Sequence, residues 1–194
     1  MWSLAGEYFP LPELVHSFAF NTAAKAIIWL APFLFAFRKR DGRWLVSPRL
    51  GFTSPFPWAP FFAGVCLIVA FLHTMHILLL GIDVWGMFQP IWIFTALAAA
   101  VIEELAFRGY LFNRQAAVIG AFKAAIINGF LFAFYHFPEL IIARNLLAVL
   151  SLRFWVIVVM GLIFSMAFAK WKNLLMTMLI HFTWNMLCYW FALS

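Results

Sequence analysis

The stretch Val101-Ile-Glu-Glu-Leu-Ala-Phe-Arg-Gly-Tyr110 places two adjacent carboxylates and an arginine inside a long apolar run. The run begins at Ile91 and resumes at Leu111, and only seven acidic residues occur in the whole chain. A charged side chain in the hydrocarbon core of a bilayer costs at least ~2.5–3.5 kcal/mol, and two adjacent carboxylates also repel each other. This cost indicates that Glu103 and Glu104 serve a function.

The composition is that of an integral membrane protein. The 194 residues are 66% hydrophobic and 10% charged, with a mean hydropathy of +0.99. A soluble domain is roughly 45–50% apolar and 25% charged. The net charge of +6 comes from basic residues clustered at the ends of apolar runs. Membrane topology and anionic headgroups explain this clustering, so we expect a lipid bilayer and no nucleic acid as partner. No basic region precedes the first apolar run, so no cleavable signal peptide is expected.

The apolar runs predict an all-α fold, a polytopic bundle of six to eight transmembrane helices in a single domain over residues 1–194. An interfacial lead-in is expected over 1–16, and the proline-rich residues 41–60 predict an irregular connector. Residues 140–151 are too short to cross a bilayer and predict a re-entrant or interfacial helix, although a hairpin over 137–153 would change the count. Six spans are expected, over residues 17–37, 60–80, 90–114, 121–137, 154–169 and 173–193.

Basic residues predict the orientation of the spans. The densest positive cluster begins at Arg38-Lys39-Arg40 and continues through Arg43 and Arg49. By the positive-inside rule, the turns at 38–58, 114–123 and 170–172 are expected to be cytoplasmic, with both termini outside. The size and composition suggest the plasma (inner) membrane of a bacterium or archaeon.

Spacing separates the two carboxylates. Glu104 and Arg108 are four residues apart, so on a helix they share a face and can pair. Glu103 points ~100° away around the same helix. One carboxylate is then neutralised by the arginine while the other faces elsewhere, which is how acid–base sites give two carboxyl groups different properties.

Two further spans carry polar residues in helical register. Asn128, Phe132 and His136 recur every four residues, and His181 and Asn185 are again four apart. Measured from the basic residues at the span ends, Glu104, His136 and His181 lie at depths of roughly 13–20 Å, which predicts one shared pocket near mid-membrane.

The alternative is that these side chains only hold helices together, as lone intramembrane His or Asn residues often do. We favour this interpretation for His73, His76 and Asn21. Asn128 is open between helix packing and a supporting role at the site.

The expected set permits hydrolysis. A carboxylate and an imidazole can activate a water, and a second imidazole with an amide can stabilise an oxyanion. Cys66 and Cys188 lie outside the motifs and no serine accompanies them, so direct attack of water on a peptide carbonyl is favoured. No cofactor is firmly implied, but Glu103, His136 and His181 also suit zinc, although no His-Glu-x-x-His occurs. The sequence leaves a metal-bound and a metal-free water equally open.

Glu103-Glu104-x-x-x-Arg108, Phe132-x-x-x-His136 and His181-x-x-x-Asn185 resemble, in order, the three motifs of the CAAX protease and bacteriocin-processing (CPBP, or Abi) family of intramembrane proteases. The resemblance covers roughly residues 90–190. It implies a membrane endopeptidase in which Glu103 and His136 activate water, while His181 and Asn185 steady the oxyanion and Arg108 orients the acidic pair. Family members have been described both as metalloproteases and as metal-free glutamate proteases.

The substrate cannot be read from the sequence. Nothing in it favours a prenylated substrate, and a membrane-anchored peptide or protein tail suits a chain of this size better. Two competing functions are a catalytically inactive membrane partner or scaffold of the same fold, and a transporter or proton relay. No motif residue is missing, which argues against the first. No repeated halves or paired broken helices are found, which argues against the second.

Overall fold

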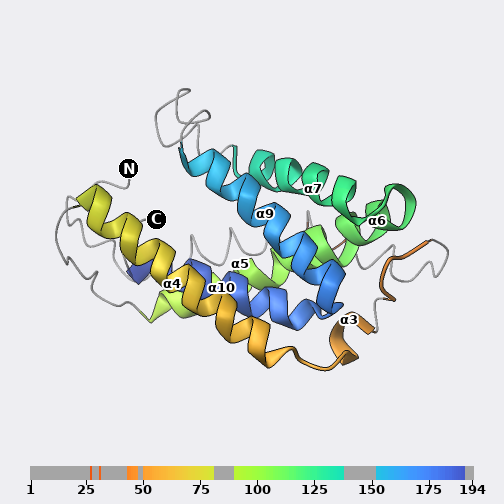
Figure 1. The fold of residues 1–194 in the computed structure, drawn as a ribbon, viewed down its shortest axis with the longest axis horizontal. Coiled ribbons are helices and arrows are strands. Elements are labelled where there is room, and N and C mark those ends of the chain that lie inside the picture. Colours follow the sequence, from red (N-terminus) through yellow and green to blue (C-terminus); the bar gives the residue numbers. More distant parts are fainter. Residues whose placement is uncertain are drawn as a thin grey trace.

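The computed structural model describes residues 43–47, 50–80, 90–137 and 152–190, together with Ile27 and Ala31. Every regular element in these residues is helical, as predicted (Figure 1). The expected lead-in over 1–16, the span over 17–37 with Asn21, the cluster at Arg38-Lys39-Arg40 and the short segment over 140–151 lie outside the described residues, apart from Ile27 and Ala31.

The helices follow the predicted apolar runs to within a few residues. They are α3 (Leu50–Thr53), α4 (Trp58–Leu80), α5 (Ile91–Glu104), the π-helix η2 (Leu105–Phe112), α6 (Asn113–Ile119), α7 (Ala121–Tyr135), α9 (Leu152–Trp171) and α10 (Leu174–Trp190). One expectation was wrong for the connector over 41–60, which contains the short helix α3. Helix α4 begins at Trp58, two residues before the expected span, and Pro60 lies in its first turn, where proline is tolerated.

The second correction concerns the span that carries the carboxylates. We expected one α-helix over 90–114, but the chain runs from α5 through the π-helix η2 into α6. A π-helix has a wider turn, and such segments are frequent at functional sites. The change of helix type falls immediately after Glu104, so both carboxylates sit at the junction.

Among the described helices, α4 and α9 are individually long and apolar enough to cross a bilayer. With 23 and 20 residues, they are roughly 30–35 Å long at 1.5 Å per residue. Helices α7 and α10 are apolar but shorter.

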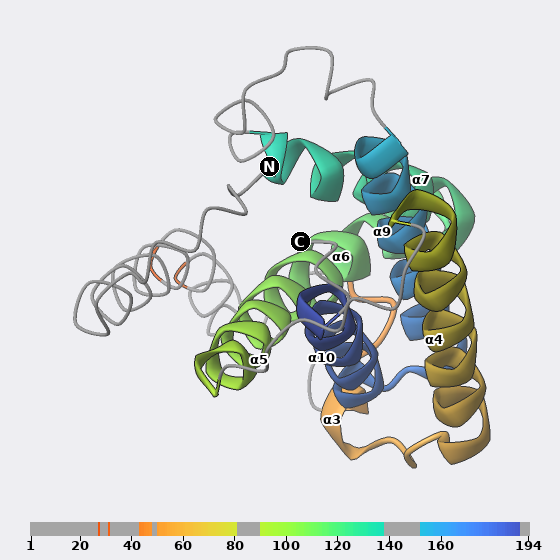
Figure 2. The same cartoon turned by 90° about the vertical axis from the view of Figure 1, so that its left-hand side faces the viewer.

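Helix α10 lies between α5 on one side and α4 on the other, and α7 packs along α9 (Figures 1 and 2). The α7–α9 crossing depends on Gly129 and Gly161, whose backbones touch. A Cβ at Gly161 would lie 2.8 Å from the Cα of Gly129, and a Cβ at Gly129 would lie 2.7 Å from the Val158 carbonyl oxygen. Small residues permit such close approach of membrane helices.

Two buried amides dock the connector onto one end of the bundle. Asn113 accepts from the Val46 amide (2.8 Å) and donates to the Val46 carbonyl (2.8 Å). Asn173 precedes α10 and caps it, because its side-chain oxygen accepts from the Met176 amide (2.9 Å). Its side-chain nitrogen donates to the Ser54 carbonyl (2.7 Å). The described parts of the three basic turns therefore share one end of the molecule, as a common cytoplasmic side requires.

Two backbone positions turn the chain at that end. Gly120 has a φ of 84° between α6 and α7, which explains a glycine at the predicted turn. Lys172 has a φ of 53° between α9 and α10.

Candidate active site

The paired carboxylates lie inside the protein. Glu103 is 3% exposed, and Glu104 and Arg108 are fully buried. Arg108 Nη1 donates to Glu104 Oε1 over 2.8 Å, and its Nη2 donates to the Gly161 carbonyl over 3.1 Å. The guanidinium also lies 4.4 Å from the ring centroid of Phe132. The predicted Glu104–Arg108 contact is thus present, and a carbonyl of α9 and an aromatic face complete the surroundings of the cation.

Glu104 also reaches the last helix. His181 Nδ1 lies 3.0 Å from Glu104 Oε1, the oxygen that accepts from Arg108. Three helices therefore meet at one oxygen atom, because α5 supplies Glu104, η2 supplies Arg108 and α10 supplies His181.

Glu103 faces both histidines. Its Oε2 lies 3.8 Å from His136 Nε2 and 3.8 Å from His181 Nε2. These distances are longer than a direct hydrogen bond and suit a bridging water. The two carboxylates thus face different groups, with Glu104 on the arginine and Glu103 between the imidazoles.

His136 is oriented by its own helix. It follows the last residue of α7, and its Nδ1 lies 2.8 Å from the carbonyl oxygen of Phe132. A carbonyl only accepts, so Nδ1 must carry the hydrogen in this contact. In the neutral ring, the lone pair of Nε2 then faces Glu103.

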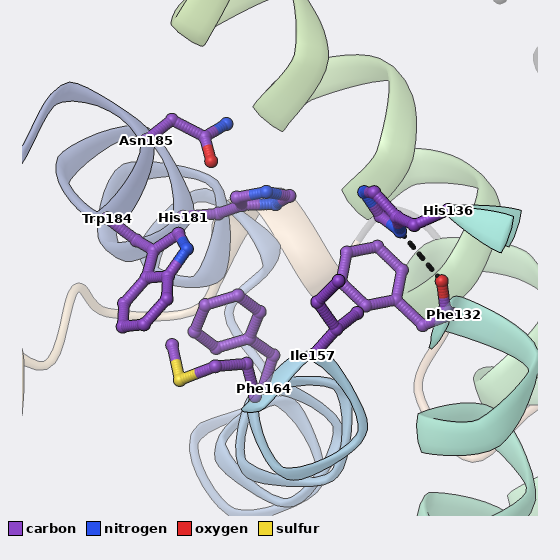
Figure 3. A pocket seen from close by; sticks show the side chains of 8 residues that line it. Phe132, His136, Ile157, Phe164, His181, Trp184 and Asn185 are labelled. Carbon is purple, nitrogen blue, oxygen red and sulfur yellow. Dashed lines mark hydrogen bonds between the residues drawn. The ribbon is translucent and has the colours of Figure 1, made fainter. Parts of the chain in front are cut away.

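A cavity of about 50 Å³ adjoins these groups (Figure 3). In Figure 3, His136 and His181 extend toward each other from α7 and α10. By the measure that roughly 10–15 Å³ holds one water, the cavity has room for several. It is walled by Phe132, His136, Ile157, Met160, Phe164, His181, Trp184 and Asn185. The predicted residues Phe132, His136, His181 and Asn185 therefore share this one cavity.

Asn128 does not line the cavity. Its Nδ2 donates to the Phe107 carbonyl of η2 over 3.1 Å, and its Oδ1 lies 3.0 Å from the Ser165 hydroxyl. That hydroxyl also lies 2.8 Å from the Gly161 carbonyl that receives Arg108. Asn128 therefore joins α7, η2 and α9 around the arginine, which is a packing contact, and its supporting role at the site stays a prediction.

Several residues of this region were not predicted. Ser165 and Gly161 are four apart on α9, and this small-residue spacing was the signal that could have found them. The cavity walls formed by Ile157, Met160 and Trp184 carry no signal, because apolar residues are everywhere in this chain.

The zinc alternative can be compared with the positions of the side chains. Ligand atoms around a tetrahedral zinc lie roughly 3.3–3.6 Å apart for bonds of 2.0–2.2 Å. The two Nε2 atoms are each 3.8 Å from Glu103 Oε2, and no group of three His, Cys, Asp or Glu within the described ranges has the arrangement of a metal site. The side chains as placed do not form the expected zinc site, so zinc stays a prediction and no step below depends on it.

The fold and the cluster together are those of a helical membrane protein with a buried carboxylate–histidine site. Comparison with known families identifies the family to which the chain belongs. The family of type II CAAX prenyl endopeptidases described as Rce1-like matches residues 85–187, slightly more than half of the chain, so the chain belongs to this family. The resemblance inferred from the three motifs is thereby confirmed.

One curated relative is similar to about half of the chain. A protein of Methanococcus maripaludis named CAAX prenyl protease 2 is 31% identical over 108 residues. The match covers 51% of this chain and 40% of the relative, so it extends over less than half of that protein's length. No solved structure matches the chain.

Proposed function

We propose that the protein is a multi-pass intramembrane endopeptidase of a prokaryotic plasma membrane, which hydrolyses a peptide bond in a membrane-anchored protein or peptide. One observation carries the proposal. Two imidazole Nε2 atoms from different helices each lie 3.8 Å from the same Glu103 oxygen, beside a cavity that can hold water. Groups placed in this way can bind a water and remove its proton.

In the proposed reaction, Glu103 is the base and His136 Nε2 helps to hold the water. One O–H bond of the water breaks and its proton moves to the carboxylate. The water oxygen bonds to the peptide carbonyl carbon, whose oxygen becomes an oxyanion. The Asn185 amide, on the cavity wall, is available to donate to that oxygen. The C–N bond then breaks while the proton passes to the departing nitrogen, which yields a carboxylic acid and an amine.

Two features support a membrane-anchored substrate. The cavity is walled largely by apolar side chains, among them Ile157, Met160 and Phe164, which suit an apolar peptide segment. The family is described as CAAX prenyl endopeptidases, and the relative is named a CAAX prenyl protease. We therefore propose a prenylated C-terminal peptide as the first substrate to test, beside the membrane-anchored peptide or protein tail that the sequence alone favoured.

The test uses the purified full chain in lipid nanodiscs with two sets of fluorogenic peptides, one farnesylated and one acylated. We expect cleavage by the wild type and a loss of at least ~10²-fold in Glu103→Gln, since general-base catalysis contributes roughly 10²–10⁴-fold. Cleavage in ¹⁸O-water should place one ¹⁸O in the new carboxyl group. Equal rates in wild type and Glu103→Gln would contradict the mechanism. An intact membrane protein that cleaves neither set would favour the inactive partner. Metal analysis and chelation before the assay test the zinc prediction.

A further inference from the structure

Glu104 is a buried carboxylate that makes both of its side-chain contacts through one oxygen, Oε1. Its Oε1 accepts from Arg108 Nη1 (2.8 Å) and lies 3.0 Å from His181 Nδ1. Its Oε2 is buried and has no hydrogen-bond partner among the described residues. The carboxylate is therefore oriented entirely by the arginine and the histidine.

This arrangement determines which nitrogen of His181 carries hydrogen. The Arg108 guanidinium has only donors and donates to Oε1, so this oxygen of Glu104 is an acceptor. His181 Nδ1 must then be the donor of the 3.0 Å contact. On the other side of the ring, Nε2 is 3.8 Å from Glu103 Oε2, too far for a donated hydrogen bond.

We infer that Glu104 is a positioning residue that holds His181 in the Nδ1–H tautomer, so that His181 enters the site as a hydrogen-bond acceptor. This differs from the oxyanion-donor role that the motif resemblance implied for His181. The Asn185 side-chain amide is then the donor on this wall of the cavity. The consequence for the reaction rests on the proposed function, whereas the tautomer itself does not.

The inferred tautomer gives the site three acceptors that face one region, namely the Glu103 carboxylate and the Nε2 atoms of His136 and His181. A water can donate to two of them at once. After the water has lost a proton, His181 Nε2 can receive it, either directly or from Glu103. The resulting imidazolium, stabilised by Glu104, gives the proton to the amine nitrogen as the C–N bond breaks.

The tautomer can be measured without any substrate. The full chain is labelled with ¹⁵N-histidine, treated with chelator and placed in nanodiscs near neutral pH. The chain has five histidines, so the signals of His181 are assigned by their loss in His181→Gln. We expect a protonated Nδ1 and an unprotonated Nε2. An Nε2–H tautomer or an imidazolium in the wild type would overturn the inference, whether or not the protein is a protease.

Two substitutions at Glu104 distinguish an acceptor from a charge. In Glu104→Gln, Arg108 holds the amide oxygen in place of Oε1, so the acceptor for His181 is kept while the charge is lost. In Glu104→Leu both are lost. We expect Glu104→Gln to retain the Nδ1–H signals and to keep kcat within about tenfold of the wild type. We expect Glu104→Leu to lose the tautomer preference and at least ~10²-fold in kcat, with KM little changed, as found when a triad histidine has the wrong tautomer.

The outcomes separate two kinds of failure. Loss of the Nδ1–H signals in a folded Glu104→Gln would overturn the positioning role. An equal fall of kcat in both variants would assign the effect to charge and also overturn it. If Glu104→Leu does not fold, the wild-type and Glu104→Gln spectra still show whether His181 has the Nδ1–H tautomer and whether a neutral acceptor at position 104 retains it. If the spectra show the expected Nδ1–H tautomer but no peptide is cleaved, the inference about His181 stands and the proposed function is contradicted.

Discussion

Helices α10 and α4 both carry histidines in an apolar run, but His181 of α10 and His73 of α4 have different surroundings. His181 on α10 is 4% exposed, contacts Glu104 and lines the cavity. His73 on α4 is exposed and does not line the cavity. Only 6% of the most apolar window of α4 is buried, so most of this helix faces outward.

The difference shows what makes a polar residue in a membrane helix informative. His181 is followed four residues later by Asn185, and α10 packs between α5 and α4, which turns this face toward the carboxylates. His73 lies on a helix that contacts the rest of the fold mainly along α10. A polar residue in a membrane helix therefore indicates a site when another polar residue lies on the same helix face, as Asn185 does for His181. Polarity alone does not distinguish His181 from His73.

The sharpest test of this comparison is to remove Glu103, which lies 3.8 Å from His181, or His136, which lines the same cavity. We expect Glu103→Ala and His136→Ala each to lower cleavage by at least ~10²-fold, because each removes an acceptor for the attacking water. Cleavage of the nanodisc substrates measures the effect, and thermal unfolding shows whether the fold survives. Full activity in a folded variant would remove that residue from the mechanism.

A second test removes Arg108, which forms the buried ion pair with Glu104, the carboxylate that His181 contacts. Its removal leaves Glu104 buried without its cation, and breaking a buried ion pair costs roughly 3–5 kcal/mol. We expect Arg108→Ala to lower both the stability in detergent unfolding titrations and the activity. Lys in place of Arg should rescue little, because it cannot donate to Glu104 and to the Gly161 carbonyl with the same planar geometry. A fully stable Arg108→Ala protein would contradict the structural importance of the pair.

Much of the fold could be predicted because apolar length and glycine or basic turns dictate it. The runs over 121–137 and 154–169 became α7 and α9, and Gly120 has the positive φ that its turn required. The depth estimate also brought Glu104, His136 and His181 together, since helical rise is regular. The sequence did not predict the π-helix. Within it, the Phe107 carbonyl accepts from Asn128 of α7, a contact between helices that spacing along the chain does not reveal. Whether Glu103, His136 and His181 are close enough to hold zinc depends on differences of less than 1 Å between their side-chain atoms. The spacing of residues along the chain does not predict such distances.

A third test concerns the contact that holds α9 beside the arginine. In Gly161→Ala the new methyl would meet backbone atoms of Gly129 at 2.8–3.3 Å, so α7 and α9 must separate. We expect a loss of about 1–3 kcal/mol in unfolding free energy, the usual cost of overpacking, with reduced activity because Gly161 also accepts from Arg108. Gly64→Ala on α4 is the matched control, since its methyl would meet only the Ile180 side chain at 3.4 Å. Equal stability of the two variants would argue against a tight α7–α9 crossing.

The smallest effect is expected at the other histidine. His73→Ala should change the unfolding free energy by less than about 0.5 kcal/mol, as for exposed positions in general, and should leave kcat/KM within about twofold. The same substitution at His181 removes a buried ring that touches Glu104, so the two variants form a direct pair under one assay. If His73→Ala abolished cleavage, α4 would contribute to the site and the cavity would be wrongly assigned. If neither variant lost activity, the contrast between α4 and α10 would reflect packing alone, and the buried polar cluster would be a device for holding helices together.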